Sequence, residues 1–119
     1  MRRIIALAAL IVAGCSNEPT PRIEVAGGDP KAGKLLLEQY SCGTCHEIPG
    51  VATAVGRTGP ALTSFAQHVY VAGKFPNTPE WLVRWIQDPP ALSPQTAMPD
   101  LDVSEANARH MAAYLYGLH

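Results

Sequence analysis

The pentapeptide Cys42-Gly43-Thr44-Cys45-His46 constrains this chain more than any other feature. Its spacing, C-x-x-C-H, is the attachment signature of c-type haem. Two thiols three residues apart can each add across one of the two vinyl groups of a porphyrin. The histidine that follows can then give the iron an imidazole nitrogen. We therefore predict one covalently bound haem c, held by Cys42 and Cys45, with His46 as an axial iron ligand.

Two other interpretations of these cysteines are weaker. A redox-active dithiol of the thioredoxin type needs a strand–helix–strand context. Instead, the leucines at 35–37 precede the motif in a helical stretch, and Pro49-Gly50 follows it. A structural zinc site needs four ligands, and the remaining histidines are scattered along the chain, at His68, His110 and His119. The motif therefore favours redox chemistry that is carried by a cofactor.

The N-terminus has the pattern of an export signal. Arg2 and Arg3 are followed by nine uninterrupted apolar residues, 4–12, whereas about 20 are needed to span a bilayer core. We predict a cleaved signal peptide at residues 1–14. The small residues before Cys15 resemble a bacterial lipoprotein cleavage site, at which that cysteine is acylated. The alternative is an ordinary secretory signal with an incidental Cys15.

Residues 15–28 are predicted to form the lipidated cysteine and a flexible tether to a single domain, 29–119. The stretch is polar, contains two prolines and ends in a glycine pair. Without the two arginines of the leader, seven basic side chains remain against ten acidic ones. This mild acidity favours a neutral or basic partner surface. The chain has no basic block of the kind that nucleic-acid binding requires.

Three helices are predicted within 29–119, and the remaining residues are expected to form loops. The first is capped by Asp29 and runs to Gln39, the second is capped by Thr78, and the third runs from Ser104 to about Gly117. Pro89-Pro90 is expected to end the second helix and to begin a loop. The apolar residues of each predicted helix recur at helical spacing. They are Ala32, Leu35, Leu36 and Leu37 in the first helix, Leu82, Trp85 and Ile86 in the second, and Met111, Tyr114, Leu115 and Leu118 in the third.

The predicted fold is therefore all-α, a small domain of about three to four helices wrapped round one covalently bound haem. Fewer than 95 residues lie beyond the tether, and so short a chain buries only a marginal core unaided. A haem would supply a large apolar plate against which such helices can pack.

The order of these elements resembles that of a class I monohaem cytochrome c. Helix, C-x-x-C-H, Gly-Pro loop, methionine loop and terminal helix follow one another over about residues 28–119. The resemblance implies that Gly33 allows the first and last helices to cross closely, beside Leu37 and Tyr114. It also implies that the carbonyl of Pro60 accepts a hydrogen bond from the imidazole of His46.

Met98, in the stretch Thr96-Ala97-Met98-Pro99-Asp100-Leu101, is the sixth-ligand candidate that the resemblance implies. A thioether is a soft, weak ligand that favours ferrous iron and raises the reduction potential. Pro99 restricts the residue before it and would shape the loop. Met111 is better placed to pack on a helix face, and His68 is an alternative ligand.

Aromatic and basic side chains are candidates for the surroundings of the ring and its propionates. Tyr70, Trp81 and Trp85 could pack on the ring edge or donate to a propionate, although each could equally be ordinary core. Similar sequences often carry an arginine near Gln67-His68, and here it is absent. The remaining candidates to pair with the propionates are Arg57, Arg84 and His68.

Together these features predict a membrane-anchored electron carrier on the periplasmic face of a bacterial membrane, within a respiratory chain. With both axial positions of the iron filled, no substrate would reach it, so no catalysis is expected. A redox donor and a redox acceptor are the expected partners. Residues 77–86 resemble a helix of cytochrome domains attached to terminal oxidases, which favours an oxidase as one partner.

Two alternatives remain open from the sequence. One is a permanent electron-transfer subunit of an oxidase or dehydrogenase complex, with the same domain and a fixed partner. The other is a haem enzyme or gas sensor, which needs an open iron position and polar distal residues.

Overall fold

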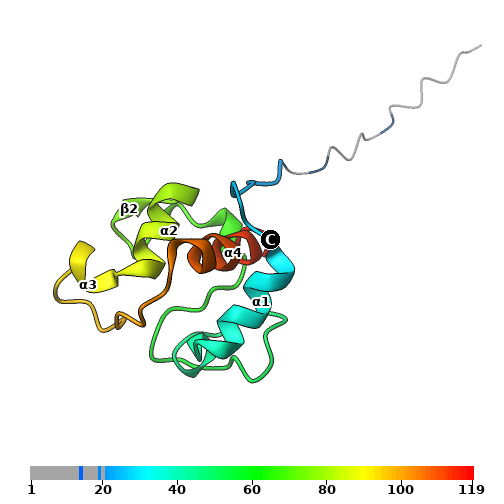
Figure 1. Cartoon of the computed structure of the whole chain (residues 1–119). Helices are drawn as coiled ribbons and strands as arrows, with labels where there is room; N and C mark the ends of the chain where they lie inside the picture. Colours follow the sequence, from blue (N-terminus) through cyan, green and yellow to red (C-terminus); the bar gives the residue numbers. More distant parts are fainter. Residues whose placement is uncertain (1–13, 15–18, 20) are drawn as a thin grey trace, which may run out of the picture.

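The computed structural model describes Gly14, Pro19 and residues 21–119 (Figure 1). Its α-helices are α1 Pro30–Gln39, α2 Pro79–Gln87, α3 Pro89–Leu92 and α4 Glu105–Leu115. Between α1 and α2 lie two 3₁₀ turns and one antiparallel strand pair: η1 Cys42–Thr44, η2 Phe65–Gln67, β1 Tyr70–Val71 and β2 Phe75–Pro76. The predicted all-α class is confirmed, with a small hairpin added. Cys15 and nearly all of the predicted leader lie outside the described residues.

The three long helices begin where their capping residues predict. The side chains of Asp29, Thr78 and Ser104 each accept a hydrogen bond from a backbone N–H in the first turn that follows. Pro30 and Pro79 are the first residues of α1 and α2. Proline suits that position because its missing N–H has no partner within the helix. Among the described residues, none of the helices has the length and apolar character needed to cross a membrane.

The expectation of a plain loop from Pro89 onward is wrong, because α3 begins there. Asp88 ends α2, and its carboxylate accepts the N–H of Ala91 at 3.0 Å, which caps α3. Buried Pro89 is the first residue of α3. Proline disrupts the interior of one helix and suits the first turn of the next, so one proline pair both stops α2 and starts α3.

α1 crosses α4 at the side of the domain where the chain enters, and α2 packs on α4 from another side (Figure 1). Gly33 makes the crossing possible, because a Cβ atom there would overlap the backbone carbonyl of His110. A Cβ atom on Gly28 would lie 2.7 Å from the carbonyl of Arg109. In addition, Nδ1 of His110 accepts the N–H of Asp29 at 2.9 Å, so α4 satisfies a free donor at the start of α1. Gly33 thus has the role that the resemblance implied.

The hydrophobic core lies between these helices and the loops that follow η1. Its large buried side chains are Val25, Leu37, Ile48, Val51, Phe65, Val71, Leu82, Val83, Trp85, Ile86, Val103, Met111, Leu115 and Tyr116. Leu35 was expected on the inner face of α1, yet it is 58% exposed. The inner face is narrower than the leucine run suggests, because the crossing turns Gly33 and Leu37, one helical turn apart, towards α4.

The packed domain begins before residue 29. Val25 is buried, and Ile23 packs against the core. Arg109 holds this segment by donating from Nη1 to the carbonyl of Ala26 at 3.2 Å, while its Nη2 pairs with Glu105 at 2.6 Å. Val25 and Ala26, which belong to the predicted tether, therefore pack against the domain, and Ala26 is held by α4.

Tyr116, rather than Leu118, is the deeply buried residue at the end of α4. Its hydroxyl donates to Oδ1 of Asn77 at 2.8 Å. The amide of Asn77 in turn donates to the carbonyls of Phe65 and His68, at 3.1 and 2.8 Å. Burial raises the pKa of Tyr116, which keeps its hydroxyl a donor. A single asparagine thus joins the η2 region to α4.

We expect Gly33→Ala to lower the free energy of unfolding by about 2–3 kcal/mol, because the new methyl group must push α4 away from α1. Denaturant unfolding of the wild type and the variant measures the change. Gly73→Ala is the matched control, since Gly73 has φ of +67° and open space around its Cβ position. Backbone strain alone should cost about 1 kcal/mol there. Equal losses in the two variants would contradict the close-crossing explanation.

Candidate functional site

The C-x-x-C-H motif lies on a tight turn that leaves the end of α1. Ser41 has φ of 56°, the left-handed conformation that commonly ends a helix. The N–H groups of Cys45 and His46 then both donate to the carbonyl of Cys42, at 3.2 and 3.0 Å. This turn holds two thiols and one imidazole on a single short piece of backbone.

Both thiols of the motif are free and half-buried. Burial raises the pKa of the Cys42 thiol. A catalytic dithiol needs the opposite shift, because its thiolate is the reactive form. Within residues 21–119, no three His, Cys, Asp or Glu side chains gather into a metal-binding cluster. The dithiol and zinc interpretations therefore gain no support from the geometry.

The segment that follows the motif folds back onto it through backbone hydrogen bonds. The N–H of Gly56 donates to the carbonyl of Gly43 at 3.0 Å, and that of Gly59 to Cys45 at 2.7 Å. Residues 47 and 55 also form an isolated antiparallel bridge. The result is a closed loop over residues 47–60, named here the proximal loop, which begins and ends beside His46.

The imidazole of His46 is held by the end of the proximal loop. Its Nδ1 lies 2.7 Å from the carbonyl oxygen of Pro60. A carbonyl can only accept, so Nδ1 carries a proton, and in the neutral imidazole the free lone pair is therefore on Nε2. Gly59 lies flat against the ring, since a Cβ atom there would be 2.8 Å from Nδ1 and 3.0 Å from Nε2. An imidazole fixed in this tautomer is the form that ligates a metal through Nε2.

Met98 lies in the loop between α3 and α4 and packs partly buried against the core. Its N–H donates to the hydroxyl of Thr96 at 3.2 Å. On the other side, the N–H of Asp102 donates to the carboxylate of Asp100 at 2.8 Å. These two local side-chain turns shape the backbone on either side of Met98-Pro99. The loop that carries the predicted sixth ligand is therefore an ordered one.

The other candidate residues are distributed over α2 and its surroundings. Trp81 stacks on Phe75 with ring centroids 4.7 Å apart, and the guanidinium of Arg84 lies 4.6 Å from the Trp81 ring. Trp85 is buried, whereas Tyr70 is 56% exposed. Arg84 is thus already engaged in a cation–π contact on the outside of α2.

Of the remaining candidates, His68 is tied to its own loop and Arg57 is exposed. Nε2 of His68 lies 3.1 Å from the carbonyl of Thr63, so that nitrogen donates a hydrogen bond. A histidine that uses Nε2 in this way is a poorer iron ligand than one whose Nε2 is free.

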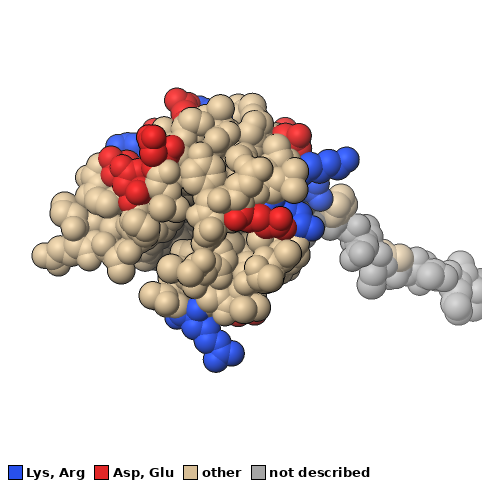
Figure 2. All heavy atoms as spheres, turned by 60° about the horizontal axis from the view of Figure 1, so that its bottom comes forward, with Lys and Arg blue, Asp and Glu red and all other residues tan. Residues whose placement is uncertain are grey.

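The two loops carry four exposed charged side chains, Glu47 and Arg57 in the first and Asp100 and Asp102 in the second. Figure 1 shows the proximal loop and the α3–α4 loop in the lower half of the molecule. Figure 2 brings that side forward and shows a largely uncharged surface, with one group of acidic and basic side chains to the right of its centre and the others towards its rim.

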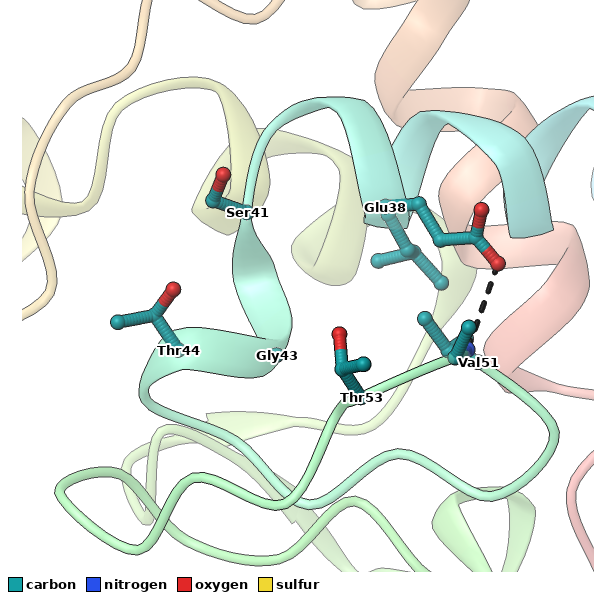
Figure 3. A pocket seen from close by; sticks show the side chains of 8 residues that line it. Glu38, Ser41, Gly43, Thr44, Val51 and Thr53 are labelled. Atoms are coloured by element: carbon teal, nitrogen blue, oxygen red, sulfur yellow. Dashed lines mark hydrogen bonds between the residues drawn. The ribbon is translucent and has the colours of Figure 1, made fainter.

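A separate surface pocket lies beside the motif (Figure 3). It is lined by Leu37, Glu38, Ser41, Gly43, Thr44, Val51, Ala52 and Thr53. Glu38 reaches across from the end of α1, and its carboxylate accepts the N–H of Ala52 at 3.4 Å. Gly43 and Thr44 of the motif line this pocket, whereas neither cysteine nor His46 does.

Comparison with known proteins places these features in a family context, although no family model matches the chain. The chain is 38% identical over 87 residues to cytochrome c oxidase subunit 2 of Alkalihalophilus pseudofirmus, covering 72% of this chain and 25% of that protein. It is 34% identical over 94 residues to cytochrome c oxidase subunit 2 of Bacillus subtilis, covering 74% and 26%. The chain thus spans about a quarter of the length of these curated relatives.

Among solved structures, cytochrome c2 from Rhodobacter sphaeroides matches with a TM-score of 0.54 and 25% identity, covering 76% of this chain and 96% of that one. This is a class I cytochrome c-like domain. It is an electron-transfer domain related to oxidase subunits, and its family implies haem c. The resemblance stated from the sequence is therefore confirmed.

The residues of this cytochrome c-like domain fit a covalently attached haem. Two free thiols lie on one turn, Nε2 of the following imidazole keeps its lone pair, and Gly59 leaves the ring room that a side chain would fill. Cys42, Cys45 and His46 would hold the group, with the carbonyl of Pro60 orienting the imidazole.

One contact of the cytochrome c-like domain was not predicted from the sequence, a hydrogen bond by which α4 holds the proximal loop. The hydroxyl of Tyr114, on α4, donates to the carbonyl of Pro49 at 2.6 Å. Tyr114 was expected only to pack at the helix crossing. No local pattern could have paired these two residues, which lie 65 positions apart.

We expect Gly59→Ala to reduce the yield of low-spin haem-loaded protein about tenfold, because the new methyl group displaces the His46 ring from Pro60. Visible spectra of the purified full chain, normalised to protein, measure the yield. Gly73→Ala serves as the control, because its Cβ position is open. An unchanged low-spin spectrum in Gly59→Ala would show that this close contact does not orient the imidazole.

Proposed function

We propose that this domain carries one electron on a haem c that is linked to Cys42 and Cys45 and ligated by His46 and Met98. The bound haem supplies an iron that cycles between the ferric and ferrous states. The geometry around His46 is the observation that supports the proposal most directly. Its Nδ1 is occupied by Pro60 at 2.7 Å, which leaves Nε2 for the iron.

The protein residues set the properties of such a site. The Pro60 carbonyl fixes the imidazole, so that little rearrangement accompanies a change of charge on the iron. Met98 would contribute a soft thioether, which favours ferrous iron. With His46 and Met98 both bound, no position is left for a substrate, and the domain would act as a carrier rather than an enzyme. The hydrogen-bonded turns around Met98 support this reading over an open iron site in an enzyme or gas sensor.

The location and partners are part of the same proposal and rest on the sequence and the relatives. A signal peptide at residues 1–14 and acylation of Cys15 would anchor the domain on the periplasmic face of a bacterial membrane. Redox proteins would donate and accept the electron within a respiratory chain. The relatives named cytochrome c oxidase subunit 2 favour a terminal oxidase as one partner. They also support the second candidate, a permanent subunit of such a complex.

We expect Met98→Ala to lose the weak methionine–iron charge-transfer band of the oxidised protein and to bind carbon monoxide rapidly when reduced. Visible spectra of the full chain matured with haem provide the measurement. Met111→Leu is the control, because Met111 is buried in α4 and leucine conserves its volume. Rapid carbon monoxide binding by the wild type would support an open iron and contradict the carrier proposal.

We expect Cys15→Ser to abolish the incorporation of labelled palmitate, because serine cannot receive the thioether-linked lipid. Labelling of bacterial cells that express the full chain, followed by purification of the protein, makes the comparison. Haem content should stay the same, which separates anchoring from maturation. A wild-type protein without label would argue against the lipid anchor.

A further inference from the structure

We propose that Tyr114 is a positioning residue for the axial imidazole. Together with Glu38 it clamps the proximal loop, and it thereby links the crossing of α1 and α4 to the iron ligand. The inference rests on the proposed function, in which His46 ligates the haem iron. The contacts that carry it lie entirely within the described residues.

The first half of the clamp is the contact between Tyr114 and the start of the proximal loop. The tyrosine hydroxyl donates to the carbonyl of Pro49, three residues after His46, at 2.6 Å. This is at the short end of the range for O–H···O hydrogen bonds. Gly50 has φ of +78°, and a Cβ atom there would overlap the tyrosine oxygen. The loop backbone is therefore shaped to admit this hydroxyl.

The second half of the clamp comes from α1. The carboxylate of Glu38 accepts the N–H of Ala52 at 3.4 Å (Figure 3). Burial, followed by the negative charge of Glu38, raises the pKa of Tyr114, so the tyrosine stays protonated and keeps donating. One polar group from each crossing helix thus holds the loop, at Pro49 and at Ala52.

The clamped segment is tied by hydrogen bonds to the part of the loop that touches the imidazole. The N–H of Ile48 donates to the carbonyl of Ala54 at 3.1 Å, which closes the clamped tip. Beyond it, the N–H of Gly59 donates to Cys45 at 2.7 Å, directly before the Pro60 carbonyl that meets His46. Because the loop is closed at both ends, a shift at its tip changes the distance between His46 and Pro60.

The chemistry of the imidazole determines whether removing the clamp makes the iron easier or harder to reduce. A short Nδ1–H···O=C bond makes Nε2 more electron-rich, which favours ferric iron. Removing the clamp loosens the loop and weakens this bond. We therefore expect the equilibrium constant for one-electron reduction to rise about two- to fivefold, a size typical of coupling through packed contacts.

The test compares two tyrosines at the C-terminal end of α4 in the haem-loaded full chain, Tyr114 in its last turn and Tyr116 as its C-cap. Tyr114→Phe removes the hydroxyl and keeps the ring. Tyr116→Phe also removes a donated hydrogen bond, but its partner is Asn77, which lies between β2 and α2. Redox titration gives the reduction equilibrium, and NMR gives the exchange rates of the His46 Nδ1 proton and the Gly59 amide. We expect faster exchange and easier reduction in Tyr114→Phe, and values like those of the wild type in Tyr116→Phe.

Gly50→Ala provides a second route to the same loss, because its methyl group displaces the Tyr114 hydroxyl. It should change the His46 readouts in the wild type and change them less in Tyr114→Phe, where the obstructing oxygen is gone and only the backbone strain at φ of +78° remains. A Tyr114→Phe protein that matches the wild type, or differs no more than Tyr116→Phe, overturns the clamp. If the proposed function is wrong, the NMR spectrum of the wild type will lack the signals of an iron-bound His46, and this outcome is separate from the test of the clamp. Gly59 amide exchange would then still test the clamp.

Discussion

The close crossing of α1 and α4 at Gly33 is the constraint on which the rest of this domain depends. Backbone lies against backbone there, because any side chain at Gly33 would overlap the His110 carbonyl. The crossing sets how α1 lies on α4, and the C-x-x-C-H turn follows directly where Ser41 ends that helix. It also fixes the C-terminal half of α4, from which Tyr114 and Tyr116 reach two different loops. A change in the spacing of α1 and α4 would therefore displace both the proximal loop and the segment around Asn77.

The local parts of this structure could be predicted from the sequence, and the non-local parts could not. Helix starts depend on one capping residue and its neighbours, so Asp29, Thr78 and Ser104 were identified correctly. The contact of His46 with Pro60 was reached through a family resemblance. The exposure of Leu35 and the burial of Tyr116 were missed, because both depend on the angle at which helices pack rather than on periodicity. The hydroxyl of Tyr114 finds its partner only after the chain has folded.

The candidate site shows how a small domain can fix a metal ligand with few residues. One carbonyl orients Nδ1 of His46, and Gly59 leaves the ring space that a Cβ atom would fill. Both belong to a loop that is held by backbone hydrogen bonds and by the buried side chains of Ile48, Val51 and Ala54. Sequence change in this loop is therefore restricted at its core positions as well as where it meets the imidazole and the two helices.

The described N-terminal segment joins the domain at one defined corner, an arrangement that fits both proposals, a tethered carrier and a part of a larger subunit. Val25 is buried, and Ala26 accepts a hydrogen bond from Arg109 on α4, so the chain reaches the domain at the corner formed by α1 and α4. Figure 1 shows this corner above the proximal and α3–α4 loops. The described residues before α1 therefore leave the largely uncharged surface of Figure 2 open. On this surface, shape and apolar contact would select a redox partner together with the exposed charges of Glu47, Arg57, Asp100 and Asp102.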